Sequence, residues 1–279
     1  MRMRKIVFAG LTTLLFAFSA QQAPAGTVLE EYCSIQPKVT EIAKHGYTAF
    51  VGNSFFYYNN GMQSMATKLA QSLPTPVKGF SATLIAISGS GQNWHDMESY
   101  FRPNAIGSTA FNPDNTIRTK QYPEGKLFDV VIMLDNSQGP IHPQLGPIFQ
   151  DFAARHAKTI RTHDAEPVLF MSWAYADKPE MTKQLAEAYT DEANKNNMLV
   201  IPAGLAFAKA KALKPDIVLH AKDNRHPSYA GSYLSAATTV AALYGVSPVD
   251  ATFNGDLPAD TARFLRQVAW DTVREFFGK

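Results

Sequence analysis

The residue types needed for nucleophilic catalysis occur in two short motifs that lie far apart in the sequence. Ser54 closes the triplet Gly-Asn-Ser directly after an apolar run at 48–51, and Asp223 and His226 stand three residues apart in the run DNRHP. A hydroxyl nucleophile needs a base, and the base needs a carboxylate that fixes its tautomer. The three-residue offset lets the carboxylate reach Nδ1 of the imidazole and leaves Nε2 for the serine hydroxyl. We therefore predict that Ser54 is the nucleophile, His226 the base and Asp223 the residue that orients the base.

Each motif also has an interpretation without chemistry. The Gly-Asn-Ser triplet could cap the helix expected at 62–73, and the aspartate and histidine pair could cap the helix expected at 227–243. A metal site could gather the same pair with His95 or His220, but the chain contains neither an HExxH motif nor paired cysteines. We therefore predict neither a metal nor an organic cofactor.

Apolar runs of strand length alternate with helical patterns along most of the chain, and the run at 80–87 is expected to be a buried strand. Such alternation implies parallel pairing through right-handed crossovers, with helices on both faces of the sheet. The sequence thus predicts an α/β fold with a central, mainly parallel five-stranded sheet, whose functional residues lie at the carboxyl edge. The expected strands are 48–51, 80–87, 128–134, 167–173 and 198–201, and the expected helices are 62–73, 144–162, 179–196, 203–213, 227–243 and 258–277.

Polar and glycine-rich loops follow the second and third expected strands. The run Ser88-Gly89-Ser90-Gly91 could present a backbone NH to a substrate, and Gln92 is expected to open the next helix. The short polar side chains of residues 135–138 could donate to an oxyanion or satisfy the backbone of their own loop. Residues 112–124, which include two prolines, are expected to form a loop.

Aromatic residues accompany these loops. Phe55 follows the nucleophile, Trp94 follows the glycine loop, and Trp173 ends the fourth expected strand. Aromatic faces suit sugar rings or apolar acyl chains, and core packing is the alternative for at least half of them. Phe55, Trp94 and Trp173 are therefore the candidate substrate-binding residues.

The first 25 residues have the pattern of a signal peptide. Three basic residues precede an apolar run at 6–20, which is too short to span a bilayer, and small residues follow it. A periplasmic or secreted protein is therefore expected, with residues 26–279 forming one α/β domain that ends in a helix. No later run is long and apolar enough to predict stable membrane insertion.

The charge balance argues against nucleic acid as a partner. The chain has 26 Lys and Arg residues against 24 Asp and Glu residues, and three of the basic residues belong to the expected leader. The remaining protein is therefore nearly neutral, and no basic block stands out. The expected partner is a small-molecule or polysaccharide ester, and no oligomeric state is predicted.

The serine triplet, the glycine turn, the polar turn after VVIML and the Asp-x-x-His pair resemble the four ordered blocks of the SGNH/GDSL hydrolase superfamily, over about residues 45–245. The resemblance implies a flavodoxin-like three-layer α/β/α sandwich and serine-dependent hydrolysis of an ester. It makes Ser54 the nucleophile, His226 the base and later the acid, and Asp223 the orienting group. It also implies an oxyanion hole formed by the NH groups of Ser54 and Gly89 and by a side chain of the third block.

Two positions depart from the common pattern of that superfamily. Asn53 stands where aspartate is commoner, and residues 135–138 read Asp-Asn-Ser-Gln where Gly-x-Asn-Asp is usual. Ser137 therefore occupies the asparagine position and Asn136 lies one residue earlier, so both are candidates for the side-chain donor. The sequence as a whole predicts an exported serine esterase for short-chain or carbohydrate O-acetyl esters. The alternative is a non-catalytic protein that binds envelope glycans on the same fold.

Overall fold

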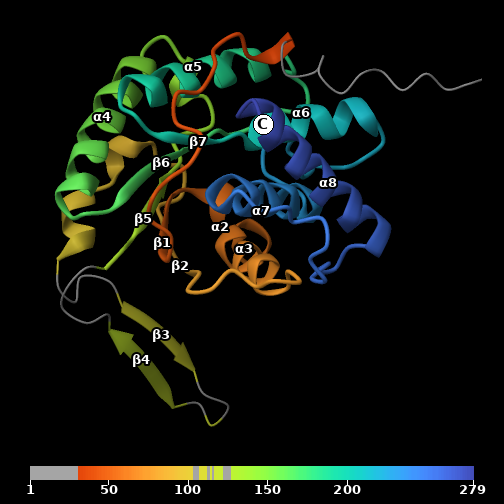
Figure 1. Cartoon of the computed structure of the whole chain (residues 1–279). Helices are drawn as coiled ribbons and strands as arrows, with labels where there is room; N and C mark the ends of the chain where they lie inside the picture. Colours follow the sequence, from red (N-terminus) through yellow and green to blue (C-terminus); the bar gives the residue numbers. More distant parts are fainter. Residues whose placement is uncertain (1–30, 103–106, 112–113, 115, 122–126) are drawn as a thin grey trace, which may run out of the picture.

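The computed structural model describes residues 31–102, 107–111, 114, 116–121 and 127–279. The expected signal peptide at 1–25 lies outside this part of the chain. Within the described residues, a parallel sheet lies between two layers of helices (Figure 1). This arrangement confirms the three-layer α/β/α sandwich that the sequence predicts.

The central sheet has five parallel strands in the order β2-β1-β5-β6-β7. Its register pairs the last residue of β1 with the last residue of β2, and the end of β1 with the end of β5, so that three strands end at one edge. Every residue of β5 is buried, as expected for an apolar inner strand of a parallel sheet. The strands are β1 (Tyr47–Gly52), β2 (Ser81–Ala86), β5 (Val130–Met133), β6 (Glu166–Phe170) and β7 (Leu199–Ile201).

Helices cover both faces of this sheet (Figure 1). Helix α7 packs against both α3 and α8 over one face, α4 and α5 cover the other, and α6 contacts α5, α7 and α8. Within the described ranges, no helix combines the length and the apolar character needed to cross a bilayer. The helices are α2 (Ser54–Tyr57), α3 (Met62–Gln71), α4 (Gly146–Thr162), α5 (Met181–Lys195), α6 (Ala203–Leu213), α7 (Tyr229–Tyr244) and α8 (Ala259–Phe276).

Strand β2 and the segment that follows it differ in structure from what the sequence predicts. The strand expected to be buried at 80–87 is instead an edge strand, and its residues are half-buried or exposed because β1 is its one neighbour among the described strands. The helix expected to open at Gln92 is replaced by two short 3-10 turns, η2 (Gln92–Trp94) and η3 (Met97–Phe101).

A hairpin occupies part of the region expected to be a loop at 112–124. Strand β4 (Ile117–Gln121) pairs antiparallel with β3 (Gly107–Phe111), and the two project away from the main sheet (Figure 1). The loop expectation is therefore wrong for residues 117–121. These residues become a strand through hydrogen bonds to a partner strand, which the polar composition of the segment does not reveal.

Buried polar contacts fix α8, and through it α7, against the body. The guanidinium of Arg266 donates to the hydroxyl of Tyr233 at 2.6 Å and to the carbonyl of Val249 at 3.0 Å. The ammonium of Lys209, which is almost completely buried, pairs with the carboxylate of Glu275. Because α7 begins directly after the His226 segment, these contacts also support one side of the candidate site.

Candidate active site

Ser54 is the first residue of α2, and only Asn53 separates it from the end of β1. Asn53 caps this short helix, because its Oδ1 accepts the NH of Phe55 at 3.1 Å. The Nδ2 of Asn53 donates to the carbonyls of Ser90 at 2.9 Å and Asp135 at 3.0 Å. The buried Asn53 side chain thus joins the segments that follow β1, β2 and β5. Asn53 therefore caps the helix while the neighbouring Ser54, which is 8% exposed, places its hydroxyl at the sheet edge.

The structure brings together the three residues predicted to do chemistry. The Oγ of Ser54 lies 2.8 Å from Nε2 of His226, although 172 residues separate them in the sequence. The Nδ1 of His226 lies 2.5 Å from Oδ2 of Asp223. The other oxygen, Oδ1, accepts the backbone NH groups of Arg225 and His226 at 3.0 Å each. Asn224, with φ of +63°, turns the chain so that the carboxylate folds back onto the imidazole.

The protonation states of this chain of contacts follow from its partners. The hydrogen bond from His226, together with those from the two backbone NH groups, lowers the pKa of Asp223 from 3.8 to about 2. The carboxylate is therefore ionised at neutral pH and accepts a hydrogen bond from Nδ1 of His226, which carries the proton. That tautomer leaves Nε2 as an acceptor, so the hydroxyl of Ser54 donates to it. This is the arrangement that a serine nucleophile and a histidine base need.

The expected substrate contacts of Phe55 and Trp173 are not seen. Trp173 has no exposed surface, and its ring is stacked between Phe55 at 4.6 Å and Phe207 at 4.4 Å. Phe55 is 4% exposed, so neither ring presents a face to a substrate. The Nε1 of Trp173 instead donates to the carbonyl of Arg225 at 2.9 Å and so holds the loop that carries His226. Trp94, at 59% exposed, does present its ring to solvent.

The candidate oxyanion donors lie on the loops at the carboxyl edge. The NH groups of Ser54 and Gly89 have no acceptor among the described residues, and Gly89 has a φ of +74° that favours glycine. The Nδ2 of Asn136 donates to the carbonyl of Gly89 at 3.3 Å, whereas the hydroxyl of Ser137 lies 2.7 Å from that of Tyr175. Neither of these two side chains bonds Ser54 here, so the choice of third donor stays a prediction.

Comparisons with known proteins agree with this geometry at the level of the fold. A candidate SGNH hydrolase from Slackia heliotrinireducens is 19% identical over 71% of this chain and 98% of its own, with a TM-score of 0.52. A DUF4886 family protein from Bacteroides uniformis is 16% identical over 81% and 93%, with a TM-score of 0.55. The chain has the SGNH hydrolase fold.

A third solved structure is more distant. A mutant of Axe2, an acetylxylan esterase from Geobacillus stearothermophilus, is 14% identical over 72% of this chain and 94% of its own, with a TM-score of 0.49. No protein-family model matches the chain, and no curated protein matches it. The SGNH fold of the chain therefore rests on structural similarity, and the activity has to be argued from the site.

The loop after β5 contains a buried carboxylate, that of Asp135. Asp135 accepts the NH groups of Gln92 at 2.9 Å and Asn136 at 2.7 Å, and so ties the loop after β2 to the loop after β5. Burial raises its pKa from 3.8 to about 6, although the two NH groups act in the opposite direction. A Cβ at Gly139 would collide with Oδ1 of Asp135, so a larger residue there would have to displace this carboxylate. From the sequence, Asp135 is one of several polar loop residues, and its role in joining the two loops is not predicted.

The histidines considered as metal ligands have other partners. Nε2 of His95 lies 3.0 Å from the hydroxyl of Ser90, Nδ1 lies 2.9 Å from that of Tyr100, and burial lowers the pKa of His95 to about 4. His220 donates from Nε2 to the carbonyl of Ala174 at 2.9 Å, and burial lowers its pKa too. Among the residues that the structure describes, no group of three or more His, Cys, Asp or Glu side chains could hold a metal ion.

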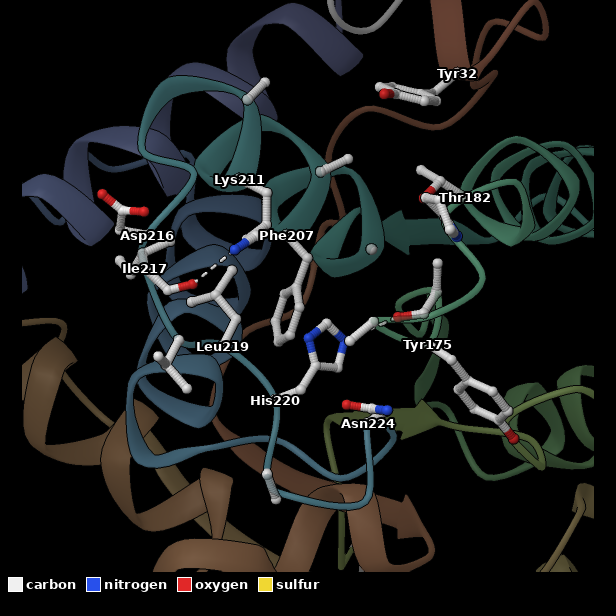
Figure 2. A pocket seen from close by; sticks show the side chains of 18 of the residues that line it. Tyr32, Tyr175, Thr182, Phe207, Lys211, Asp216, Ile217, Leu219, His220 and Asn224 are labelled. Atoms are coloured by element: carbon white, nitrogen blue, oxygen red, sulfur yellow. Dashed lines mark hydrogen bonds between the residues drawn. The ribbon is translucent and has the colours of Figure 1, made fainter.

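A cavity of about 640 Å³ lies behind the loop that carries His226. Figure 2 shows Phe207 and His220 in its wall, with Asn224 and Tyr175 below them. The walls are mostly apolar, and neither Ser54 nor His226 lines them. The cavity is therefore distinct from the groups that would react with an ester.

Proposed function

We propose that this protein is a serine hydrolase that cleaves carboxylic esters through an acyl-enzyme formed on Ser54. The observation that carries the proposal is the continuous contact from Ser54 Oγ to His226 at 2.8 Å and from His226 to Asp223 at 2.5 Å. The serine, base and carboxylate each have the partner that their role requires. The SGNH fold adds support, because the three residues lie on the blocks that the sequence resemblance assigns to them.

The reaction follows from the positions of the protons. Ser54 Oγ attacks the ester carbonyl carbon while its proton passes to Nε2 of His226, and the carboxylate of Asp223 stabilises the resulting imidazolium. Collapse of the tetrahedral intermediate breaks the bond to the alcohol oxygen, which takes the proton from Nε2. Water then attacks the acyl-serine, gives one proton to Nε2 and releases the acid, and the same proton returns to Ser54.

The oxyanion is proposed to bind at the carboxyl edge of the sheet. The NH of Ser54 lies at the start of α2, and the NH of Gly89 lies on the exposed glycine turn. Both are without an acceptor among the described residues, so both are available to the developing charge. Asn136 or Ser137 would supply the third donor after its present hydrogen bond is exchanged.

The proposed substrate is a short-chain ester or an O-acetyl group on a carbohydrate, and the proposed location is outside the cytoplasm. Export is supported by the basic and apolar pattern of residues 1–25. A carbohydrate substrate is supported by the exposed ring of Trp94 on η2 and by the ring of Tyr57, which is 38% exposed. Exposed aromatic faces suit sugar rings.

Steady-state hydrolysis tests this proposal. The mature protein would be assayed with 4-nitrophenyl acetate, butyrate and octanoate and with acetylated xylooligosaccharides. We expect Ser54→Ala and His226→Ala each to lower kcat by roughly three or more powers of ten without loss of folding. Ser64→Ala, which changes a serine on the following helix, should retain wild-type activity. Full activity in either site variant would overturn the assignment, and a wild-type protein that binds glycans but hydrolyses no ester would favour the non-catalytic alternative.

A further inference from the structure

We infer that the turn η1 (Tyr58–Asn60) is a brace that positions His226 for catalysis. The turn begins four residues after Ser54, so one short segment would set both the nucleophile and its base. The inference rests on the proposed function, because it gives the turn a role in the reaction of Ser54. Two independent sets of contacts carry it, one through aromatic rings and one through an amide.

Aromatic rings of the Ser54 segment enclose the imidazole. The ring of Tyr58 lies parallel to that of His226, with centroids 4.1 Å apart and an angle of 8° between the planes. Phe55 meets the same imidazole edge to face at 5.5 Å and 74°. Rotation of the imidazole about its own axis would break its contacts to both Ser54 and Asp223, and the face of Tyr58 blocks that rotation. An aromatic face also favours the imidazolium that forms during proton transfer.

The side chain of Asn59 ties the turn to the far side of the His226 segment. Its Nδ2 donates to the carbonyl of Pro227 at 3.1 Å and to the hydroxyl of Ser232 at 2.8 Å. Pro227 directly follows the base, and Ser232 lies in the first turn of α7. Both protons of a single amide thus hold residues that are 168 and 173 positions away in the sequence. The base cannot move away from Ser54 without losing these bonds.

The backbone of the turn is unusual in a way that fits a functional role. Asn59 has φ of +56° and ψ of +44°, and Asn60 has φ of +67°, so two consecutive residues other than glycine are left-handed. This conformation is unfavourable for most residues, and asparagine tolerates it better than most. Such outliers concentrate where surrounding contacts hold them for function. Here the conformation presents the Asn59 amide to Pro227 and Ser232.

Matched variants separate the brace from general stability. Asn59→Gly keeps the left-handed backbone and removes the amide, and Asn60→Gly makes the same change at a neighbour whose side chain has no hydrogen bond among the described residues. Tyr58→Phe keeps the stacking face, and Tyr58→Leu removes it. A misplacement of about 1 Å at a reacting group can lower the rate about a hundredfold. We expect Asn59→Gly and Tyr58→Leu to lower kcat about 10- to 100-fold with little change in KM, while Asn60→Gly and Tyr58→Phe stay within about threefold of wild type.

Two readouts are needed, because the brace and the esterase activity can fail separately. The first is kcat and KM on the best ester, with folding checked by thermal unfolding. The second is hydrogen exchange of the amides of residues 221–228, which reports the His226 segment whether or not the protein is an esterase. Faster exchange there in Asn59→Gly, but not in Asn60→Gly, is expected together with the loss of kcat.

Each contrary result overturns a defined part of the inference. Unchanged exchange and unchanged kcat in Asn59→Gly and Tyr58→Leu would overturn the brace. If Asn59→Gly or Tyr58→Leu raises KM and leaves kcat at the wild-type value, the residue contacts the substrate and does not position the base. If Asn60→Gly loses as much kcat as Asn59→Gly, the effect comes from the stability of the turn and not from the Asn59 amide. If the wild-type protein hydrolyses no ester and does not react at Ser54, the proposed function fails, and unchanged exchange would then be the separate sign that the brace fails as well.

Discussion

Replacement of Asp223 by asparagine tests the proton arrangement of the site with the smallest change of shape. In the native protein, Oδ1 accepts two backbone NH groups at 3.0 Å, from Arg225 and His226, and Oδ2 faces Nδ1 of His226 at 2.5 Å. An asparagine has one oxygen and one NH2 group. The oxygen must face the two backbone donors, because the NH2 group would be repelled there. The NH2 group then faces Nδ1 and turns that atom into an acceptor.

The consequence for His226 is the wrong tautomer. With Nδ1 as an acceptor, the proton of the neutral imidazole moves to Nε2, which then faces Ser54 and cannot take a proton from it. The corresponding change in a serine triad lowers kcat about 10⁴-fold, which amounts to about 5.5 kcal/mol of transition-state stabilisation. We therefore expect Asp223→Asn to lose about four powers of ten in kcat with KM nearly unchanged.

The assay is ester hydrolysis with circular dichroism as a check on folding. Asp177→Asn, which removes an exposed carboxylate from a neighbouring loop, is the matched control and should behave as wild type. The pKa of Asp223, lowered to about 2, means that its contribution to folding stability is present above pH 3.8 and is lost as the pH falls toward 2. A kcat within tenfold of wild type in Asp223→Asn would refute the tautomer argument.

Three further results are expected. Whichever of Asn136→Ala and Ser137→Ala lowers kcat about a hundredfold supplies the third oxyanion donor, and no loss in either would place the hole elsewhere. Glu275→Ala leaves the buried ammonium of Lys209 unpaired, so we expect the free energy of unfolding to fall by about 3 kcal/mol and Tm by about 8 °C, and a Tm change below about 1 °C would contradict this. The raised pKa of Asp135 means that its contribution to stability is complete below pH 3.8 and is lost as pH rises through about 6, and a carboxyl NMR titration with a midpoint below pH 4 would contradict it.

Local sequence rules predicted the parts of this protein that depend on short-range pattern. The alternation of apolar runs and helical segments was sufficient for the parallel sheet, because each crossover limits how the next strand can pair. The carboxyl-edge rule then placed Ser54 at the edge of the sheet. The need of a serine nucleophile for a base paired it with His226, and the two lie 2.8 Å apart in the structure. The three-residue offset of Asp223 from His226 was likewise enough to predict their contact.

Features that depend on long-range packing could not be predicted in the same way. An aromatic residue at a strand end suits either a core or a substrate site, and for Trp173 the stacking between Phe55 and Phe207 decides for the core. The proposed role of Asn59 depends on two partners more than 160 positions away, and the residues around Asn59 in the sequence do not identify them. The only local hint was the pair of asparagines before a glycine, a composition typical of left-handed turns.

The most direct test of the central claim is reaction of the folded protein with a fluorophosphonate probe, followed by peptide mapping. The account predicts modification at Ser54, absent in Ser54→Ala and strongly slowed in His226→Ala and Asp223→Asn, because the probe reports an activated serine whatever the natural ester is. No modification of the folded wild-type protein, or modification at a different serine, would contradict the claim that Ser54 and His226 form a working nucleophile and base.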